Sequence, residues 1–217
     1  MTPWQTVPLS GSLARIREPE QVEAPVFLLL HGWTGDEKVM EPFTRALPDG
    51  LWVLFRAPFP APSQGYSWLA EIPQGGTQLE HFRPAIDHLE AWLHELERRF
   101  PQVDWQRKHW IGFSQGGATI LAWALHHPQE SQSLSVLAGF LPRGVSPYLE
   151  RQVLLGKPVF IAHGTKDRII PVDRAQRMAS TLEESGARVT YCEEPVGHKV
   201  GTGCLRRWKP FWKEVEG

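Results

Sequence analysis

The chain has 217 residues, of which 41% are hydrophobic, 11% aromatic and 22% charged, and this composition excludes the charge-rich, aromatic-poor type of disordered chain. Because 23 Lys and Arg residues face 24 Asp and Glu residues, the net charge of -1 provides no bulk positive field for nucleic acid or an anionic membrane. The length predicts one domain that spans residues 1–217.

Short apolar runs alternate with longer segments of helical period along the chain. This alternation predicts an α/β fold, with a mostly parallel central sheet, helices on both faces and no large cap domain. The expected strands are 13–17, 26–31, 51–56, 109–113, 134–138, 159–163 and 189–193, and a first hairpin is expected within residues 4–17. The expected helices are 40–47, 79–99, 115–127, 173–185 and 205–214, with Gly186 in the position that ends the fourth.

The first twenty residues are interrupted by prolines and contain no apolar core, so we expect no signal peptide and a cytoplasmic location. The apolar run at 26–30 is much shorter than the ~20 residues that span a bilayer, which excludes membrane insertion of this segment. Cys192 and Cys204 form no CxxC pair, and we therefore expect two free thiols.

The strongest functional signal is Gly112-Phe113-Ser114-Gln115-Gly116, a G-x-S-x-G pattern between a predicted strand and a predicted helix. Such a nucleophile elbow projects a serine hydroxyl from the sheet, and its glycines avoid collisions between neighbouring backbone segments. Ser114 is therefore the candidate nucleophile of an acyl-transfer reaction.

A serine nucleophile needs a general base, and the base needs an acid that orients it. Asp167 follows the strand predicted at 159–163, at the edge where open α/β sheets build their sites, and it is the candidate acid. Asp173 is interpreted instead as the N-terminal cap or a first-turn acid of the next helix. His198 lies in a glycine-containing loop just after the last predicted strand and is the candidate base.

Acyl transfer also needs hydrogen-bond donors that stabilise the developing oxyanion. The candidates are the backbone N–H of Gln115 and that of Trp33, which lies in the loop His31-Gly32-Trp33-Thr34-Gly35. The Trp33 indole either walls an acyl pocket or simply packs. We expect His31 to anchor its loop, and His163 to support the Asp167 loop by hydrogen bonding.

Two connections, 57–78 and 139–157, are longer than the usual loops of a compact α/β domain. We expect them to flank the pocket and to offer an apolar surface to an acyl chain, with Trp33 beside it. The side chains assigned to this surface are Phe59, Tyr66, Trp68 and Leu141. Their packing in the core beneath the loops is an open alternative.

These segments resemble the carboxylesterase/phospholipase family of α/β hydrolases, which includes bacterial esterases and acyl-protein thioesterases. The resemblance covers most of the chain and rests on the segments 30–37, 112–117, 163–171 and 197–198. It implies a metal-free serine hydrolase without a cofactor, with Ser114, Asp167 and His198 as the triad and the amides of Trp33 and Gln115 as the oxyanion hole. The chain departs from the HG-x-G pattern that is frequent in the family, because it has one more residue before the glycine.

The sequence therefore predicts a serine carboxylic ester hydrolase that forms an acyl-enzyme and acts on small to medium acyl esters, or on thioesters. The expected partner is a small-molecule ester, with no cofactor, metal, nucleic acid or membrane insertion, and the expected assembly is a monomer or homodimer. Two alternatives stay open, because fold and triad do not determine the substrate. They are an amide or lactone hydrolase with the same triad, and a catalytically silent binding protein of the same fold.

Overall fold

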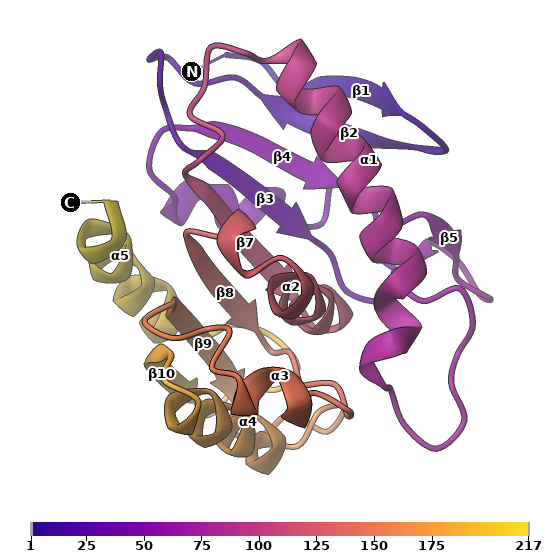
Figure 1. Ribbon diagram of the computed structural model, residues 1–217, viewed down its shortest axis with the longest axis vertical. Helices are drawn as coiled ribbons and strands as arrows, with labels where there is room; N and C mark the ends of the chain where they lie inside the picture. Colours follow the sequence, from indigo (N-terminus) through magenta and orange to yellow (C-terminus); the bar gives the residue numbers. More distant parts are fainter. Residues whose placement is uncertain (1, 217) are drawn as a thin grey trace.

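An eight-stranded sheet forms the centre of the structure, a computed structural model that describes residues 2–216 (Figure 1). Its strands are β1 (Gln5–Leu9), β2 (Ser12–Arg17), β3 (Val26–Leu30), β4 (Leu51–Phe55), β7 (Lys108–Phe113), β8 (Ser133–Leu137), β9 (Pro158–Gly164) and β10 (Arg188–Glu194). They are ordered β1-β2-β4-β3-β7-β8-β9-β10, and every pair from β4 to β10 is parallel. The hairpin β1–β2 joins β4 in antiparallel orientation. The predicted α/β class and mostly parallel sheet are confirmed.

Helices connect the strands close to the predicted positions. They are α1 (Arg83–Arg99), α2 (Gln115–His126), α3 (Ser146–Glu150), α4 (Val172–Glu184) and α5 (Thr202–Glu216), with 3₁₀ turns η1 (Glu41–Ala46), η2 (Leu79–Phe82) and η3 (Pro128–Glu130). The segment expected as a helix at 40–47 is instead the 3₁₀ turn η1, which is only six residues long, and 3₁₀ helices occur mainly as short segments. The first long connection contains a small hairpin, β5 (Phe59–Pro60) and β6 (Tyr66–Ser67).

The inner parallel strands β3, β4, β7, β8 and β9 are buried on both faces, and their side chains alternate between two apolar layers. The parallel strand β10 lies at the edge of the sheet and is only partly buried. In β3, Val26, Leu28 and Leu30 belong to one layer, whereas Phe27 and Leu29 belong to the other. The first layer also contains side chains of α1, α2 and α4, and the second contains side chains of α5 and η1. Figure 1 shows α1 and α2 crossing the sheet on the near side.

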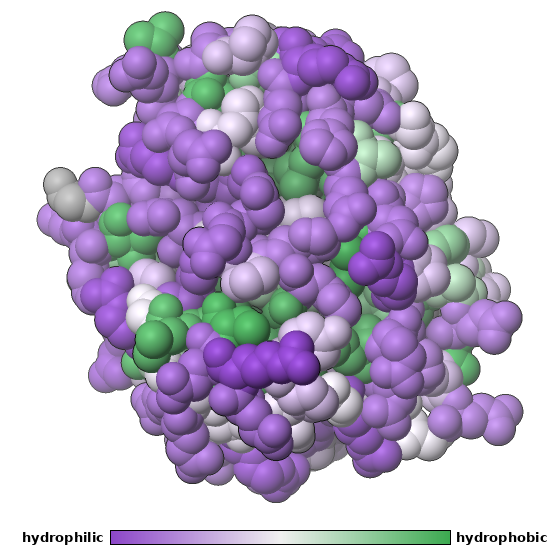
Figure 2. Space-filling view, in the orientation of Figure 1, coloured by the Kyte–Doolittle hydropathy of each residue, from purple (hydrophilic) through white to green (hydrophobic). Residues whose placement is uncertain are grey.

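The helices turn polar side chains outward, so the face seen in Figure 2 is mostly hydrophilic with smaller hydrophobic areas. Within residues 2–216, no helix is both long and apolar enough to cross a membrane.

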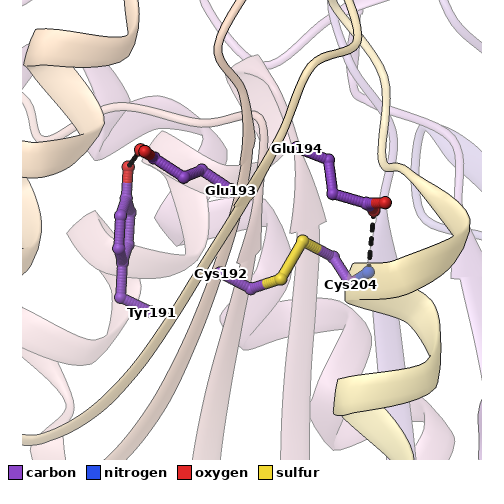
Figure 3. Close-up of a disulfide and its surroundings, with 5 residues drawn as sticks. All are labelled: Tyr191, Cys192, Glu193, Glu194 and Cys204. Carbon is purple, nitrogen blue, oxygen red and sulfur yellow. Dashed lines mark hydrogen bonds between the residues drawn. A yellow bond between two sulfur atoms is a disulfide. The ribbon is translucent and has the colours of Figure 1, made fainter.

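Cys192 and Cys204 form a disulfide, and the expectation of two free thiols is therefore wrong. Cys192 lies on β10 and Cys204 in the first turn of α5, where the Glu194 carboxylate accepts a hydrogen bond of 2.8 Å from the Cys204 N–H (Figure 3). The two cysteines meet because the chain reverses between β10 and α5 and returns beside the strand, a path that their spacing in the sequence does not encode. The bridged segment contains His198.

Candidate active site

Ser114 occupies a sharp turn between β7 and α2. Its φ of +53° is unusual for a residue with a side chain and is typical of strained functional turns. A Cβ atom at Gly112 would lie 2.2 Å from the carbonyl oxygen of Gly116, and one at Gly116 would lie 2.3 Å from that of Leu30. Only glycine fits these two positions, which gives the physical reason for the G-x-S-x-G pattern.

The three residues of the expected triad lie in one hydrogen-bonded chain. The Nε2 atom of His198 is 2.9 Å from the Oγ atom of Ser114, and its Nδ1 atom is 2.6 Å from Oδ2 of Asp167. They follow β7, β9 and β10, whose carboxyl ends meet at the same edge of the sheet. Residues separated by up to 84 positions are thereby brought into contact in the order that proton transfer from the serine requires.

The Asp167 carboxylate is buried and well supplied with donors. Its Oδ1 atom accepts hydrogen bonds from the amides of Ile169 at 2.8 Å and Ile170 at 3.0 Å. Burial alone would raise the pKa of Asp167, but the hydrogen bonds from His198 and from these two amides lower it below its usual value. The Nε2 atom of His163 lies 2.8 Å from the carbonyl oxygen of Ile170, and His163 thereby supports this loop, as expected.

The loop after β3 packs directly against the Ser114 turn. A Cβ atom at Gly32 would be 3.2 Å from Cβ of Ser114. The backbone of the next residue, Trp33, therefore starts close to the candidate nucleophile. Within residues 2–216, the backbone N–H groups of Trp33 and Gln115 donate to no backbone acceptor. This is compatible with the expected role of both groups as oxyanion donors.

His31 anchors this loop, as expected from the sequence. Its Nε2 atom accepts a hydrogen bond of 3.0 Å from the Ala57 N–H, and its Nδ1 lies 2.7 Å from the carbonyl oxygen of Gly32. This pair of contacts requires the neutral ring with the proton on Nδ1. Burial lowers the pKa of His31 to about 4, which keeps the ring neutral.

Trp68 forms hydrogen bonds to both candidate oxyanion segments. Its Nε1–H donates to the carbonyl oxygen of His31 at 2.8 Å, and its backbone N–H donates to Oε1 of Gln115 at 2.9 Å. The side chain is fully buried, so the expectation that Trp68 lines a substrate pocket is not met. Its packing and hydrogen bonds instead connect the loop after β3 to the Ser114 turn.

The hairpin β5–β6 accommodates the extra residue of the first motif. The Thr34 N–H donates to the carbonyl oxygen of Tyr66 at 2.9 Å, and the Tyr66 N–H donates to that of Gly35 at 3.0 Å. Thr34 itself has a φ of +66°, outside the ordinary range for its residue type. The backbone pairing holds the longer turn in place, in the part of the chain where the sequence departs from the family pattern.

An apolar cavity of about 540 Å³ opens beside the Ser114 turn. Its lining is Gly32, Trp33, Thr34, Gly35, Val39, Met40, Pro42, Phe43, Phe113, Lys199, Val200 and Leu205. Trp33 is 48% exposed and lines this cavity. Of the two alternatives for its indole, a pocket wall or simple packing, the structure favours the pocket wall. The other lining residues come from the loop between β3 and η1, from η1 itself, from Phe113 and from the segment after His198. The only sequence signal for the last segment is its closeness to His198.

The remaining residues assigned to the pocket lie elsewhere. Phe59 packs edge-on against His88, and the ring of Tyr66 stacks with the guanidinium of Arg56. Leu141 lines a separate cavity beside α4. The long connections therefore place these side chains in packing contacts or on another surface.

Across residues 2–216, no three His, Cys, Asp or Glu side chains are grouped in a way that could hold a metal ion.

Known proteins share this arrangement of elements. A family model described as Phospholipase/Carboxylesterase matches residues 12–213. Carboxylesterase SOBER1 of Arabidopsis thaliana is 31% identical over 97 residues, which cover 44% of this chain and only 42% of that protein. A solved carboxylesterase of Bacillus cereus has a TM-score of 0.80 at 21% identity, over 93% of both chains. One from Mesorhizobium loti has a TM-score of 0.80 at 18% identity, over 98% of both.

Identities as low as those of the two solved structures show a shared fold alone, whereas the family match extends over nearly the whole chain. It includes the loop after β3, the Ser114 turn and the loops that carry Asp167 and His198. The chain that places these segments at one edge of its sheet belongs to the phospholipase/carboxylesterase family of α/β hydrolases.

Proposed function

We propose that this chain is a serine carboxylic ester hydrolase that forms an acyl-enzyme on Ser114 and acts on small to medium acyl esters. The observation that carries the proposal is the continuous contact from Ser114 through His198 to the buried Asp167 carboxylate. Family membership supports the same reaction class.

In the acylation step, Oγ of Ser114 attacks the ester carbonyl carbon while its proton passes to Nε2 of His198. The Asp167 carboxylate accepts the hydrogen bond of Nδ1–H and stabilises the imidazolium. The amides of Trp33 and Gln115 donate to the oxyanion, where one such donor is worth about 2.7–4 kcal/mol. The tetrahedral intermediate then expels the alcohol, which takes the proton from His198 and leaves the acyl group on Ser114.

In the deacylation step, a water molecule gives a proton to Nε2 of His198 and its oxygen attacks the acyl carbonyl carbon. The second tetrahedral intermediate collapses with loss of the Ser114 oxygen, which regains its proton from His198. The products are the carboxylic acid and the original enzyme. A thioester follows the same route with a thiol as the leaving group.

Hydrolysis of p-nitrophenyl esters with graded acyl lengths, measured with a metal chelator present, tests this proposal. We expect turnover by the wild type and a loss of about 10³-fold or more in Ser114→Ala. Ser180→Ala is the matched control, because Ser180 is an exposed serine on α4. Equal turnover by wild type and Ser114→Ala would contradict the assignment of the nucleophile.

Labelling with a serine-directed phosphonate separates the proposal from the silent-scaffold alternative. We expect covalent labelling of the wild type and of Ser180→Ala, and none of Ser114→Ala. A wild type that neither turns over esters nor accepts the label would contradict the proposed enzyme.

A cytoplasmic location and a monomeric or homodimeric state complete the proposal. The disulfide weighs against the first part, since such bonds are more common in oxidising compartments. Fractionation of the producing cells tests the location, and light scattering of the purified protein tests the assembly. Recovery outside the cytoplasm, or a larger oligomer, would overturn the respective part.

A further inference from the structure

A second cavity, of about 500 Å³, collects three arginines where the end of the connection 57–78, the start of the connection 139–157 and α4 meet. We call it the arginine cavity. Its lining includes Gly76, Thr77, Leu141, Arg143, Arg174 and Arg177. The first two residues belong to the connection 57–78, the next two to 139–157, and the last two to α4.

Arg143 is held in place by the backbone around it. Its Nη1–H donates to the carbonyl oxygen of Gly75 at 2.8 Å, and its own N–H donates to that of Thr77 at 2.9 Å. Gly76 has a φ of +109°, and a Cβ atom there would lie 3.2 Å from Cζ of Arg143. The glycine thus lets the backbone lie flat against the guanidinium, which is positioned before any ligand arrives.

Arg174 is positioned by an aromatic ring. Its Cζ atom lies 4.7 Å from the centroid of Phe140, and a guanidinium stacked in this way keeps its N–H edge available for an acceptor. Arg177 pairs with Asp173 at 2.6 Å. Within residues 2–216, no carboxylate lies within ion-pair distance of Arg143 or Arg174.

The cavity therefore gathers more positive charge than it neutralises. Burial lowers the pKa of Arg174, and the charges of Arg143 and Arg177 lower it further, which indicates mutual repulsion. An anion between the guanidinium groups would remove this repulsion and accept several charged hydrogen bonds.

One lining residue of the arginine cavity, Leu141, closely follows a backbone segment that packs against the Ser114 turn. A Cβ atom at Gly139 would lie 3.3 Å from the backbone oxygen of Ser114, and Leu141 follows two residues later, at most about 7 Å further along the chain. The apolar cavity is lined by η1 and the start of α5, which cover one face of the sheet, whereas the arginine cavity is lined by α4, which covers the other. The Ser114 turn lies at the sheet edge that both faces share.

We propose that the arginine cavity binds an anionic group with at least two acceptor oxygens, a carboxylate or a phosphate. The group is either a terminal group of the ester or a free anion. Binding of a free anion is independent of the proposed function. Binding of an anionic group that belongs to the ester rests on the proposed ester hydrolysis.

Titration calorimetry with inorganic phosphate and with glutarate, at constant ionic strength, tests the binding. We expect Arg143→Gln and Arg174→Gln to weaken the affinity about tenfold or more, as for loss of a charged hydrogen bond. Arg98→Gln, an exposed arginine at the end of α1, should bind as the wild type does. Circular dichroism checks that each variant is folded. Absence of binding to the wild type, or equal affinity in all variants, would overturn the proposal.

Two matched series of p-nitrophenyl esters identify the source of the anion. One carries a free terminal carboxylate, and the other is its neutral analogue of equal chain length. If the substrate supplies the anion, the ratio of the two kcat/KM values falls about tenfold in Arg174→Gln and stays constant in Arg98→Gln. An unchanged ratio together with weakened phosphate binding identifies a free anion. If no ester is hydrolysed by any variant, the proposed function fails, and the titration alone still decides the arginine cavity.

Discussion

Trp68 lies outside the candidate triad and connects the two segments that carry the candidate oxyanion donors. Its indole donates to the carbonyl oxygen of His31 and its backbone N–H donates to the Gln115 side chain, so it links the two candidate donor segments. We expect Trp68→Phe to lower kcat about tenfold, or ~1.4 kcal/mol, with KM changed less than twofold. The reason is that misplaced donors lose affinity for the transition state more than for the ground state.

Trp110→Phe is the matched control for this kinetic measurement. Trp110 is also fully buried, and its Nε1–H donates to the carbonyl oxygen of Glu130 at 3.0 Å. Steady-state kinetics of both variants should separate an effect on the oxyanion segments from a loss of packing. An equal loss of kcat in the two variants would refute the role of Trp68.

His31 gives the folded state a specific sensitivity to acid. Its pKa is lowered to about 4 in the folded chain, against about 6.5 when it is exposed, so protons bind the unfolded state more tightly. The stability that depends on neutral His31 is complete above pH 6.5 and is lost as the pH falls toward 4. The loss at pH 4.5 should be roughly 2.5 kcal/mol.

Urea unfolding at pH 7 and pH 4.5, for the wild type and His31→Gln, measures this effect. The wild type should lose more free energy of unfolding between the two pH values than the variant, by roughly 2.5 kcal/mol. Asp167 contributes little to the difference between these two pH values. Its pKa is lowered in the folded chain, so its contribution to stability is lost only as the pH falls toward and below the ordinary pKa of an aspartate. Equal losses in both proteins would show that His31 is not the group that titrates.

The residues of the candidate triad could be placed together because each one follows a predicted strand within a short, recognisable pattern. Ser114 lies between the glycines of its turn, and Asp167 and His198 lie in the loops that follow β9 and β10. Trp68 could not be placed in the same way, because its burial depends on the path of a long connection. Its aromatic side chain suits a pocket wall and a core equally well, and only tertiary contacts decide between them.

At the scale of elements, the disulfide attaches the start of α5 to β10 and encloses the loop of His198. The two cysteines are 12 positions apart, and closing a loop of that size should stabilise the folded state by about 3 kcal/mol. The double variant Cys192→Ser/Cys204→Ser should therefore unfold at a lower urea concentration. Thiol titration before and after reduction checks that the bond is present in the purified wild type.

The same double variant should keep most of its activity, with kcat lowered less than about threefold. The His198 loop is also held by backbone hydrogen bonds, from Thr165 to Glu194 at 2.8 Å and from Lys166 to Val196 at 3.0 Å. Reductant should lower the unfolding midpoint of the wild type and leave that of the double variant unchanged. A wild-type midpoint that ignores reductant would contradict the stabilising role of the bond.

The regular elements were predictable to the extent that local patterns determine them. Gly186 ends α4 as expected, with a φ of +91° and the Ala187 N–H donating to the carbonyl oxygen of Leu182 at 3.0 Å. The hairpin β5–β6 was not predictable, because strands of two residues have no measurable period. The pairing of Cys192 with Cys204 depends likewise on how α5 docks against β10.

At the scale of the whole molecule, the open carboxyl edge of the sheet determines what reaches Ser114. The two long connections at this edge, 57–78 and 139–157, contribute only the small hairpin β5–β6 and the five-residue helix α3, so no cap domain covers the apolar cavity within residues 2–216. A cavity that opens to solvent can bury only part of a long acyl chain. Further methylene groups would extend into water and gain no binding energy.

The acyl-length profile should therefore rise and then level off. Each buried methylene contributes about 0.8 kcal/mol, roughly fourfold in kcat/KM, until the cavity is filled, which we expect below about twelve carbons. Val39 is 49% exposed and lines the cavity, so Val39→Phe should move the optimum to shorter acyl chains. Val22→Phe is the control, because Val22 is 76% exposed and absent from the lining. A profile that rises steadily beyond twelve carbons, or one that Val39→Phe leaves unchanged, would place the acyl chain outside this cavity.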